Sequence, residues 1–438
     1  MAGYGVGSIG TGTFATVPGL LLLIYMTDTL GVPAALAGLG IFVPKLWDVV
    51  TDPFMGSISD RTESRFGRRR PYLLAGALSL PVCFALIFST PDLGSPMLAF
   101  AWVITAYILA ATAFTVFCVP YVAMPAEMSE DYHEVTALMG WRIALMTVGI
   151  LLSGALAPQL IAHGGGGRAG YETMALIISA VLLASMLTAF FATSRAPGRA
   201  RVEQTPPFRE QLRAALEVRP FRVLISAYAV QLVGVGTILA SVPFFARYQL
   251  AGDDDTVTIL FVALVLPAFL FMPVWVLISK RTGKLAAYLV ATVMLGLGAA
   301  SLWFSSPDAV GLVYAQVAIM GVGWAGTQLF PFSMLPDTIT VDREATGQRR
   351  EGVFTGLWMA VDKGGMAVGA LLAGLFLDLG GFVESEGGTP VTQPDSALTA
   401  ILCCSAVVPA VFLLASLPIL RRYGLAAPRA SDKGMLQA

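Results

Sequence analysis

The stretch KLWDVVTDPFMGSISDRTESRFGRRRP, residues 45–71, decides how the rest of the chain is interpreted. Its first part is apolar enough to lie inside a bilayer, yet it contains Lys45, Asp48 and Asp52. Because the two aspartates are four residues apart, a helix places them on one face, one turn from each other. Two stacked carboxylates at membrane depth are costly and repel each other, and a bound cation or proton would relieve the repulsion. The stretch therefore predicts a cation site; the alternative is a structural pair tied to a lysine or arginine.

The composition places the chain in a membrane. Of its 438 residues 56% are apolar and 13% are charged, and the mean hydropathy is +0.75. A soluble domain needs far more polar surface than this. We find no nucleotide-binding motif and no catalytic constellation, so we expect neither an enzyme nor a nucleic-acid-binding protein. The cysteines lie in apolar runs without metal-ligand spacing, and we expect no cofactor beyond a coupling ion.

Long apolar runs separated by short polar loops predict an all-α membrane protein with twelve transmembrane helices. The expected spans are residues 7–29, 35–59, 72–90, 96–126, 136–163, 172–193, 219–249, 257–279, 285–304, 310–334, 352–379 and 396–420. They predict an N-terminal six-helix bundle (1–193), a linker (194–218), a C-terminal six-helix bundle (219–422) and a tail (423–438).

The basic residues predict the orientation. They gather in the loops after the second, sixth, eighth and tenth spans and in the tail, whereas the opposite loops contain almost none except Arg168 and Arg247. By the positive-inside rule, both termini and the linker are cytoplasmic. We expect a multi-pass protein of the inner (cytoplasmic) membrane.

An internal repeat is visible in the sequence. The segment PFMGSISDRT from Pro53 matches PVWVLISKRT from Pro273, and VGILLSG from Val148 matches VGALLAG from Val368. Both offsets are 220 residues (273 − 53 and 368 − 148). The chain thus consists of two six-helix halves of the same orientation, an architecture that places substrates and coupling ions between the halves at the bilayer midplane.

The two halves differ at the charged positions. At the same offset, Asp48 and Asp52 correspond to Ala268 and Met272, so only the N-terminal half has the acidic pair. The helix that corresponds to residues 136–163 carries Lys363 instead. A lysine that competes with a cation for two aspartates would couple the halves; the alternative is a lysine that snorkels toward the membrane surface.

The sequence resembles a known family of carriers. Three segments carry the resemblance: PKLWDVVTDPFMGSISDRTESRFGRRRP, VPYVAMPAEMSEDYHEVTALMGWR and MLPDTITVDREATGQRREGVFTGLWMAVDKGGMAVG. They look like segments of the glycoside–pentoside–hexuronide:cation symporters, the melibiose carrier-like branch of the major facilitator superfamily. The resemblance implies a major facilitator fold and cation-coupled uptake of a sugar, glycoside or related small solute. It assigns cation binding to Asp48, Thr51, Asp52 and Thr115, whose oxygens suit a hard cation such as sodium. Sodium and proton coupling both remain open.

The resemblance also identifies substrate-site candidates, with departures. The sugar-binding acids of the melibiose carrier fall at Gly12 and Cys118, whereas the arginine of its fifth helix matches Arg142. The candidate substrate residues are Cys118, Tyr121, Trp141, Arg142 and Trp358. Loss of both acids leaves a second possibility, because VPY…AE also resembles a lysophosphatidylcholine symporter branch. A cation-coupled lysolipid or amphiphile transporter and a passive uniporter are therefore the alternatives.

Other charged residues lie at the predicted cytoplasmic ends of the spans. Asp60 and Arg61 precede the arginine run, and Asp337 is the matching residue of the C-terminal half. We expect Asp60, Arg61, Glu127 and Asp337 to form closing salt bridges and act in gating rather than in substrate contact. The expected partners are a small-molecule substrate, a coupling cation and membrane lipid, and we expect a monomer.

Overall fold

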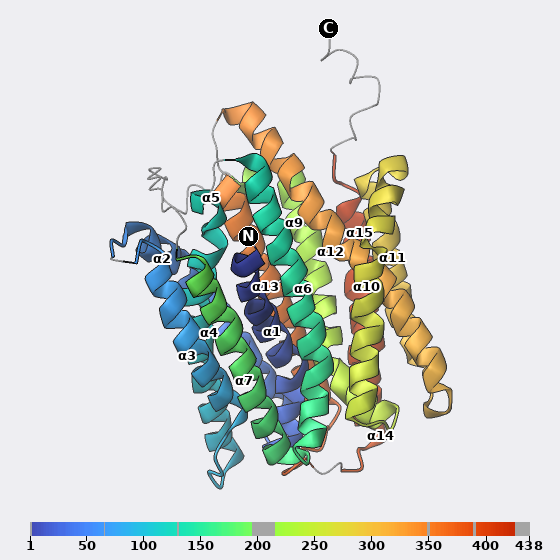
Figure 1. Cartoon of the computed structure of the whole chain (residues 1–438). Coiled ribbons are helices and arrows are strands. Elements are labelled where there is room, and N and C mark those ends of the chain that lie inside the picture. Colours follow the sequence, from blue (N-terminus) through green and yellow to red (C-terminus); the bar gives the residue numbers. More distant parts are fainter. Residues whose placement is uncertain are drawn as a thin grey trace.

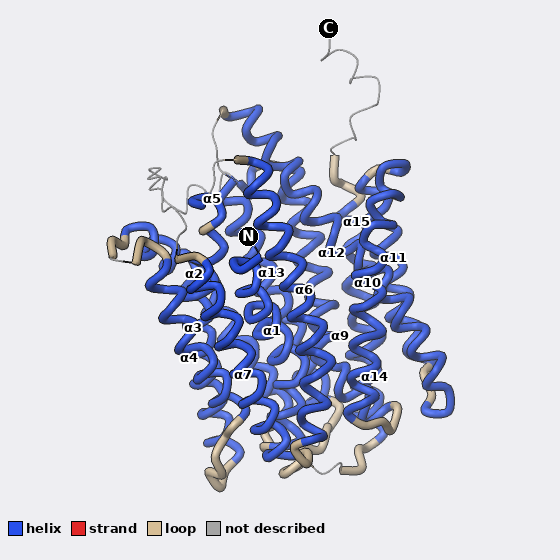
Figure 2. Tube along the Cα trace, in the orientation of Figure 1, coloured by secondary structure: helices blue, strands red, loops and turns tan. Residues whose placement is uncertain are grey.

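The computed structural model describes residues 2–64, 66–128, 131–194, 215–347, 351–388 and 391–424. Twelve of its helices are long and apolar enough to cross a membrane. The described residues contain no β-strand, only an isolated bridge between Leu30 and Glu386 (Figure 2). The all-α prediction with twelve spans is therefore confirmed. Most of the predicted linker and of the tail lies outside the described residues.

The N-terminal half contains six long helices. They are α1 (Ala2–Ile24), which continues as a π-helical turn (Tyr25–Thr29), α2 (Ala34–Arg61), α3 (Arg70–Phe88), α4 (Pro96–Ala123), α6 (Tyr132–His163) and α7 (Gly167–Ala192). A short helix, α5 (Pro125–Met128), follows α4. In Figure 1 these elements run from blue to green and gather on one side of the molecule.

The C-terminal half repeats this pattern. It contains α9 (Arg219–Phe244) with its own π-helical turn (Phe245–Gln249), α10 (Asp254–Thr282), α11 (Lys284–Ser301), α12 (Val310–Thr346) and α13 (Glu351–Leu379). The last span is α14 (Asp395–Leu402), a π-helical turn (Cys403–Val407) and α15 (Val408–Leu420). Two short 3-10 turns (Leu302–Phe304 and Pro307–Ala309) join α11 to α12.

Several helices extend beyond their predicted ends, and α12 and α1 show why. α12 continues to Thr346 rather than residue 334, and α1 begins at Ala2 rather than residue 7. Hydropathy predicts where the apolar segment ends. The helix itself can continue beyond that point until a residue with a non-helical backbone conformation ends it. α12 is stopped by Gly347, whose left-handed conformation (φ 69°) allows its N–H to bond the carbonyl of Arg343.

The repeat appears in three dimensions as a pseudo-twofold axis between α1 and α9. The two π-helical turns begin at Tyr25 and Phe245, which are 220 residues apart (245 − 25). Residues at the same offset meet across the axis: the Tyr248 hydroxyl donates to a carboxylate oxygen of Asp28 at 2.6 Å. The offset of 220 residues found in the sequence is thus also the symmetry of the fold.

Two helix pairs form the seam between the halves. α2 packs along α13 and α6 packs along α10, and the repeat exchanges one pair with the other. We call the end that carries the Arg61–Arg70 loop the basic end, and the opposite end, at Thr29 and His163, the far end. Near the far end a methyl group on Gly38 would lie 3.1 Å from the carbonyl oxygen of Leu371, so α2 and α13 approach closely there only because residue 38 is glycine.

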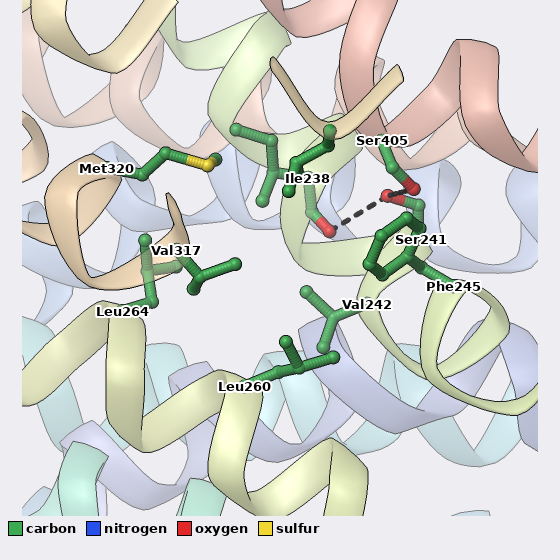
Figure 3. Close-up of a pocket in the computed structure, with 10 residues that line it drawn as sticks. Ile238, Ser241, Val242, Phe245, Leu260, Leu264, Val317, Met320 and Ser405 are labelled. Carbon is green, nitrogen blue, oxygen red and sulfur yellow. Dashed lines mark hydrogen bonds between the residues drawn. The ribbon is translucent and has the colours of Figure 1, made fainter. Parts of the chain in front are cut away.

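A small apolar cavity lies within the C-terminal half (Figure 3). Its lining comes from α9, α10, α12 and the π-helical turn Cys403–Val407, and includes Ile238, Leu264 and Met320. The only polar groups that line it are the hydroxyls of Ser241 and Ser405, which bond each other at 3.2 Å. Because the cavity contains no charged group and no predicted site residue, we treat it as a packing void.

Candidate functional site

The acidic pair lies at the middle of its helix. α2 covers Ala34–Arg61, whose midpoint is 47.5, so Asp48 is as far from either membrane surface as this helix allows. α13 covers Glu351–Leu379, whose midpoint is 365, and Lys363 lies half a turn before it. Because α2 and α13 pack along each other, the carboxylates of one half face the lysine of the other at the same depth.

Lys363 is held by both aspartates. Its ammonium lies 2.6 Å from a carboxylate oxygen of Asp52 and 3.5 Å from one of Asp48. The Thr115 hydroxyl donates to the second oxygen of Asp52 at 2.7 Å and lies 3.4 Å from the second oxygen of Asp48. The ammonium therefore occupies the position between the carboxylates where a coupling cation would bind.

The surroundings favour a positive charge at this position. The Lys363 ammonium lies 5.6 Å from the centroid of the Phe114 ring, a cation–π distance. Asp48 is 1% exposed, whereas the side chains of Asp52 and Lys363 are 26% and 14% exposed. Asp52 is therefore the carboxylate that a cation from solution reaches first.

Thr51 is the member of the predicted cation set that the structure does not bring to the carboxylates. Its hydroxyl donates to the backbone carbonyl of Trp47 at 3.0 Å, one turn earlier in α2. Serine and threonine hydroxyls commonly bond the preceding turn of a helix in this way. The Thr51 oxygen has no contact with Asp48 or Asp52 side-chain oxygens among the described residues, and its role as a ligand stays a prediction.

Three of the predicted substrate residues lie on α4 and α6. Cys118 belongs to α4, and Arg142 belongs to α6. The Nε atom of Arg142 is buried and has no hydrogen-bond partner among the described residues. Next to it, Trp141 is 48% exposed. A guanidinium with a buried, unused Nε donor suits a polar substrate group, and the role of these residues stays a prediction.

The other two substrate candidates are buried. Tyr121 is fully buried: its hydroxyl donates to the backbone oxygen of Tyr4 at 2.6 Å, and the two rings stack with centroids 4.5 Å apart. Trp358 is 1% exposed and stacks on Tyr228 at 4.5 Å. In this conformation a solute cannot reach either ring, so both side chains contribute to the packing of their own half.

The predicted gating residues form two clusters, one in each half. At the basic end, Arg69 pairs with Asp60 at 2.7 Å and with Glu127 at 2.6 Å, and Arg68 joins Glu127 at 2.6 Å. In the other half Lys284 pairs with Asp337 at 2.7 Å.

These clusters do not join the halves. Among the described residues, none of their ion pairs crosses from one half to the other, and Arg61 forms none at all. The gating role of Asp60, Arg61, Glu127 and Asp337 stays a prediction.

The far end is tied across the halves by a cluster that sequence reasoning missed. The Asp28 carboxylate, 1% exposed, accepts from Arg247 at 3.1 Å and from Tyr248 at 2.6 Å. The amide of Gln159 in α6 donates to Asp255 of α10 at 2.6 Å. We name these five residues the far-end cluster. The available signal was that Arg247 interrupts loops almost free of basic residues, and such a residue needs a partner.

The loop between α13 and α14 completes the closure. Its backbone N–H groups at Ser385, Gly387 and Gly388 donate to the carbonyls of residues 27–29, at 2.9–3.1 Å. The backbone N–H of Ala34 at the start of α2 donates to Glu384 at 3.2 Å. Apart from Lys363 and Asp52, the hydrogen bonds that cross between the halves in the described ranges lie at this end, so the far side is sealed.

Comparison with known proteins identifies the family. Residues 3–427 match the family model described as MFS/sugar transport protein. An uncharacterized symporter of Synechocystis sp. is 28% identical over 94% of this chain and 92% of its own length. The isoprimeverose transporter of Lactiplantibacillus pentosus is 26% identical over 87% and 79%. A sodium-dependent lysophosphatidylcholine symporter of Danio rerio is 22% identical over 92% and 83%.

The family agrees with the geometry. Two six-helix halves meet around a charged site at mid-membrane, and the resemblance seen in three separate segments extends over almost the whole chain. Transporters of this kind move solutes and perform no covalent chemistry, in keeping with the non-enzymatic prediction. The chain belongs to the MFS/sugar transport protein family of multi-pass membrane symporters.

Proposed function

We propose that this protein imports a sugar or glycoside together with a monovalent cation that binds Asp48 and Asp52. The observation that carries the proposal is the Lys363 ammonium, 2.6 Å from Asp52 and 3.5 Å from Asp48, at the position where the cation would bind. Lysine and cation cannot occupy this position together. The cation must therefore displace the lysine. Because Lys363 belongs to the C-terminal half, its displacement breaks a contact between the two halves.

The exchange gives a coupling mechanism. Without a cation, the Lys363 ammonium holds α13 against α2 through Asp52 and Asp48. When a cation enters through Asp52, Thr115 retains its hydrogen bond and supplies a neutral oxygen, while Lys363 leaves. The halves then move about the axis between α1 and α9, which exposes the site to the other side of the membrane. Cation binding and the conformational change are thus linked through one side chain.

The proposed orientation follows from the positive charges. The basic end faces the cytoplasm and the far end faces outward, with both termini inside and the chain in the inner membrane. From the contacts that join the halves at the far end, we infer that this conformation faces inward. We infer a monomer, because the two halves supply both sides of the site.

Sodium is the coupling ion that we favour over the proton. Thr115 places a neutral oxygen against both carboxylates, an arrangement that a sodium ion needs and a proton does not. Thr51 would add a second oxygen after rotation of its side chain. The alternative substrate class is an amphiphile, because one relative, 22% identical, is named a sodium-dependent lysophosphatidylcholine symporter.

A thermal-shift screen of the purified protein tests the function. It compares sugars, glycosides and lysolipids, each in sodium chloride and in choline chloride at constant pH. A ligand at about a hundred times its dissociation constant stabilises the folded state by about 2.7 kcal/mol, which a melting curve resolves. We expect a sugar or glycoside to raise the melting temperature, and to raise it more in sodium than in choline.

The other outcomes of the screen are equally informative. Stabilisation by lysolipids alone would replace the sugar proposal with the amphiphile alternative. Equal stabilisation in sodium and choline, together with a dependence on pH, would assign the proton as coupling ion. A ligand that binds equally well with every cation and at every pH would make the protein a uniporter and would contradict the symport proposal.

A further inference from the structure

An apolar groove lies between α10 and α11 on the lipid-facing side of the C-terminal half. Its volume is about 300 Å³. Both helices pack mainly on α12 and only slightly on each other, so α12 forms the floor of the groove. Trp275 and Val322 line this floor, where the indole N–H donates to the Val322 carbonyl at 2.7 Å. Phe271 and Val290 also line the groove and are 40% and 53% exposed, so its open side faces the hydrocarbon of the bilayer.

The groove exists because α11 begins with small residues. A single residue joins α10 to α11. The third residue of α11 is Ala286, whereas the third residue of α3, the equivalent helix of the N-terminal half, is Tyr72. The Tyr72 hydroxyl bonds the hydroxyl of Thr62 at 2.6 Å, and Thr62 is the counterpart of Thr282 (282 − 62 = 220). A tyrosine therefore joins two helices of the N-terminal half at the place where the C-terminal half leaves space.

The groove has the depth of one leaflet of the bilayer. Its lining on α10 extends from Phe271 to Thr282, a difference of 11 residues (282 − 271). At about 1.5 Å per residue this corresponds to about 16 Å along the helix, close to half of the ~30 Å hydrocarbon thickness of a bilayer. The groove thus extends from the basic end to about the middle of the membrane, as one acyl chain of that leaflet does.

The lining suits a hydrocarbon chain and not a polar solute. Its polar side-chain groups are both used within the protein, because the Thr282 hydroxyl donates to the carbonyl of Ile278 at 3.0 Å and the Trp275 N–H donates to Val322. A helix of another protein is too large, since one turn about 10 Å across and 5.4 Å long fills roughly 400 Å³. An extended acyl chain matches the volume, the depth and the chemistry of the groove.

A positive charge lies at the basic end of the groove. Arg281 follows Val274 by seven residues and Ile278 by three, so it lies on the side of α10 that lines the groove. It is exposed and forms no ion pair or hydrogen bond among the described residues. The nearby Lys284 is already paired with Asp337 at 2.7 Å. Arg281 is therefore the side chain that an anion at this end of the groove would meet.

We propose that the groove binds one acyl chain of an anionic phospholipid from the leaflet at the basic end, with the phosphate of the lipid at Arg281. Arginine binds phosphate through charge-assisted hydrogen bonds, often two in parallel. By the proposed orientation this leaflet is the cytoplasmic one. None of the lining residues belongs to the candidate cation or substrate site, so the lipid site does not depend on which solute is transported.

Native mass spectrometry of the purified, delipidated protein tests the site. The protein is titrated with phosphatidylglycerol and, separately, with phosphatidylcholine of the same acyl chains, and the dissociation constant of the tightest-bound lipid is measured. We expect phosphatidylglycerol to bind about fivefold more tightly than phosphatidylcholine, and Arg281→Gln to remove this difference. Ala286→Tyr gives α11 the residue that α3 has, and should weaken the binding of both lipids by about tenfold or more. Ala286 is exposed, so the tyrosine requires no change in the protein interior.

The matched control is Lys280→Gln. Position 280 is two residues from both Ile278 and Thr282, so the variant removes a positive charge from the opposite side of α10 at nearly the same depth. It should change neither affinity by more than about twofold.

Three results would overturn the inference. Equal weakening by Lys280→Gln and Arg281→Gln would mean that the lipid is attracted to the basic surface in general. Unchanged binding of phosphatidylglycerol to Ala286→Tyr would mean that the chain does not enter the groove. A dimer of the parent that Ala286→Tyr separates into monomers would assign the groove to a second copy of this chain.

Discussion

Replacing Asp52 by asparagine is expected to abolish cation-driven accumulation of substrate. The Asp52 carboxylate is the shorter contact of Lys363, at 2.6 Å, and the more exposed of the pair. An asparagine keeps the volume and can still bond Thr115, but it carries no charge to attract a cation or to hold the lysine.

The loss should be specific to coupling. Vesicles that contain the variant are loaded with unlabelled substrate, and uptake of labelled substrate is followed with and without an inward cation gradient. Exchange down the substrate gradient needs no net cation movement and should survive, while gradient-driven accumulation should fall to background. Asp378→Asn, which removes an exposed carboxylate near the far end of α13, is the control and should still accumulate. Full accumulation by both Asp48→Asn and Asp52→Asn would rule out the acidic pair as the coupling site.

The second large effect is expected at the far-end cluster. Asp28→Asn removes the carboxylate that Arg247 and Tyr248 share across the axis. Arg247 then retains only Asp254, at 3.8 Å. Because a broken buried ion pair leaves an uncompensated charge, the sealed state should lose about 1–3 kcal/mol relative to the open one. That change shifts the population of the open far side by about fivefold to a hundredfold.

Cysteine labelling measures this shift. Leu239, whose side chain packs on Gly19 across the axis, is replaced by cysteine in a background without the four native cysteines. A membrane-impermeant maleimide applied at the far side should label it at least fivefold faster in Asp28→Asn than in the parent. Asp92→Asn, an 87% exposed acid at the same end, should leave the rate unchanged. Equal labelling of parent and Asp28→Asn would mean that the far-end cluster does not hold the seal.

The sequence predicted the fold because its signals are local. A long apolar run forms a helix in a membrane whatever its neighbours are. The repeat at an offset of 220 residues predicts two halves of the same fold, even when no contact between them is known. The signal for the acidic pair was also local, because the spacing of Asp48 and Asp52 alone places them on one face of a helix. A comparison of the two halves then identified Lys363 as the basic residue of the other half. For the helical spans, the repeat and the positions of these three residues, the prediction from the sequence agrees most closely with the structure.

Partners across the halves could not be predicted in this way. Asp28 and Tyr248 are 220 residues apart and meet only because the axis passes between them. At the basic end the sequence also did not identify Arg69 as the partner of both Asp60 and Glu127. Burial could not be predicted either, because the sequence does not distinguish a buried aromatic side chain from one that faces a cavity. Tyr121 is buried by the stacked ring of Tyr4 and by its hydrogen bonds.

The central claim is that Lys363 and the coupling cation compete for one position, and the affinity of Lys363→Ala for that cation tests it most directly. Isothermal titration of sodium into purified parent and variant, at fixed pH and ionic strength, measures the dissociation constants. Without the ammonium the two carboxylates have no competitor, so the variant should bind sodium about tenfold more tightly or better. A variant that binds sodium as weakly as the parent, or more weakly, would show that lysine and cation do not share the site.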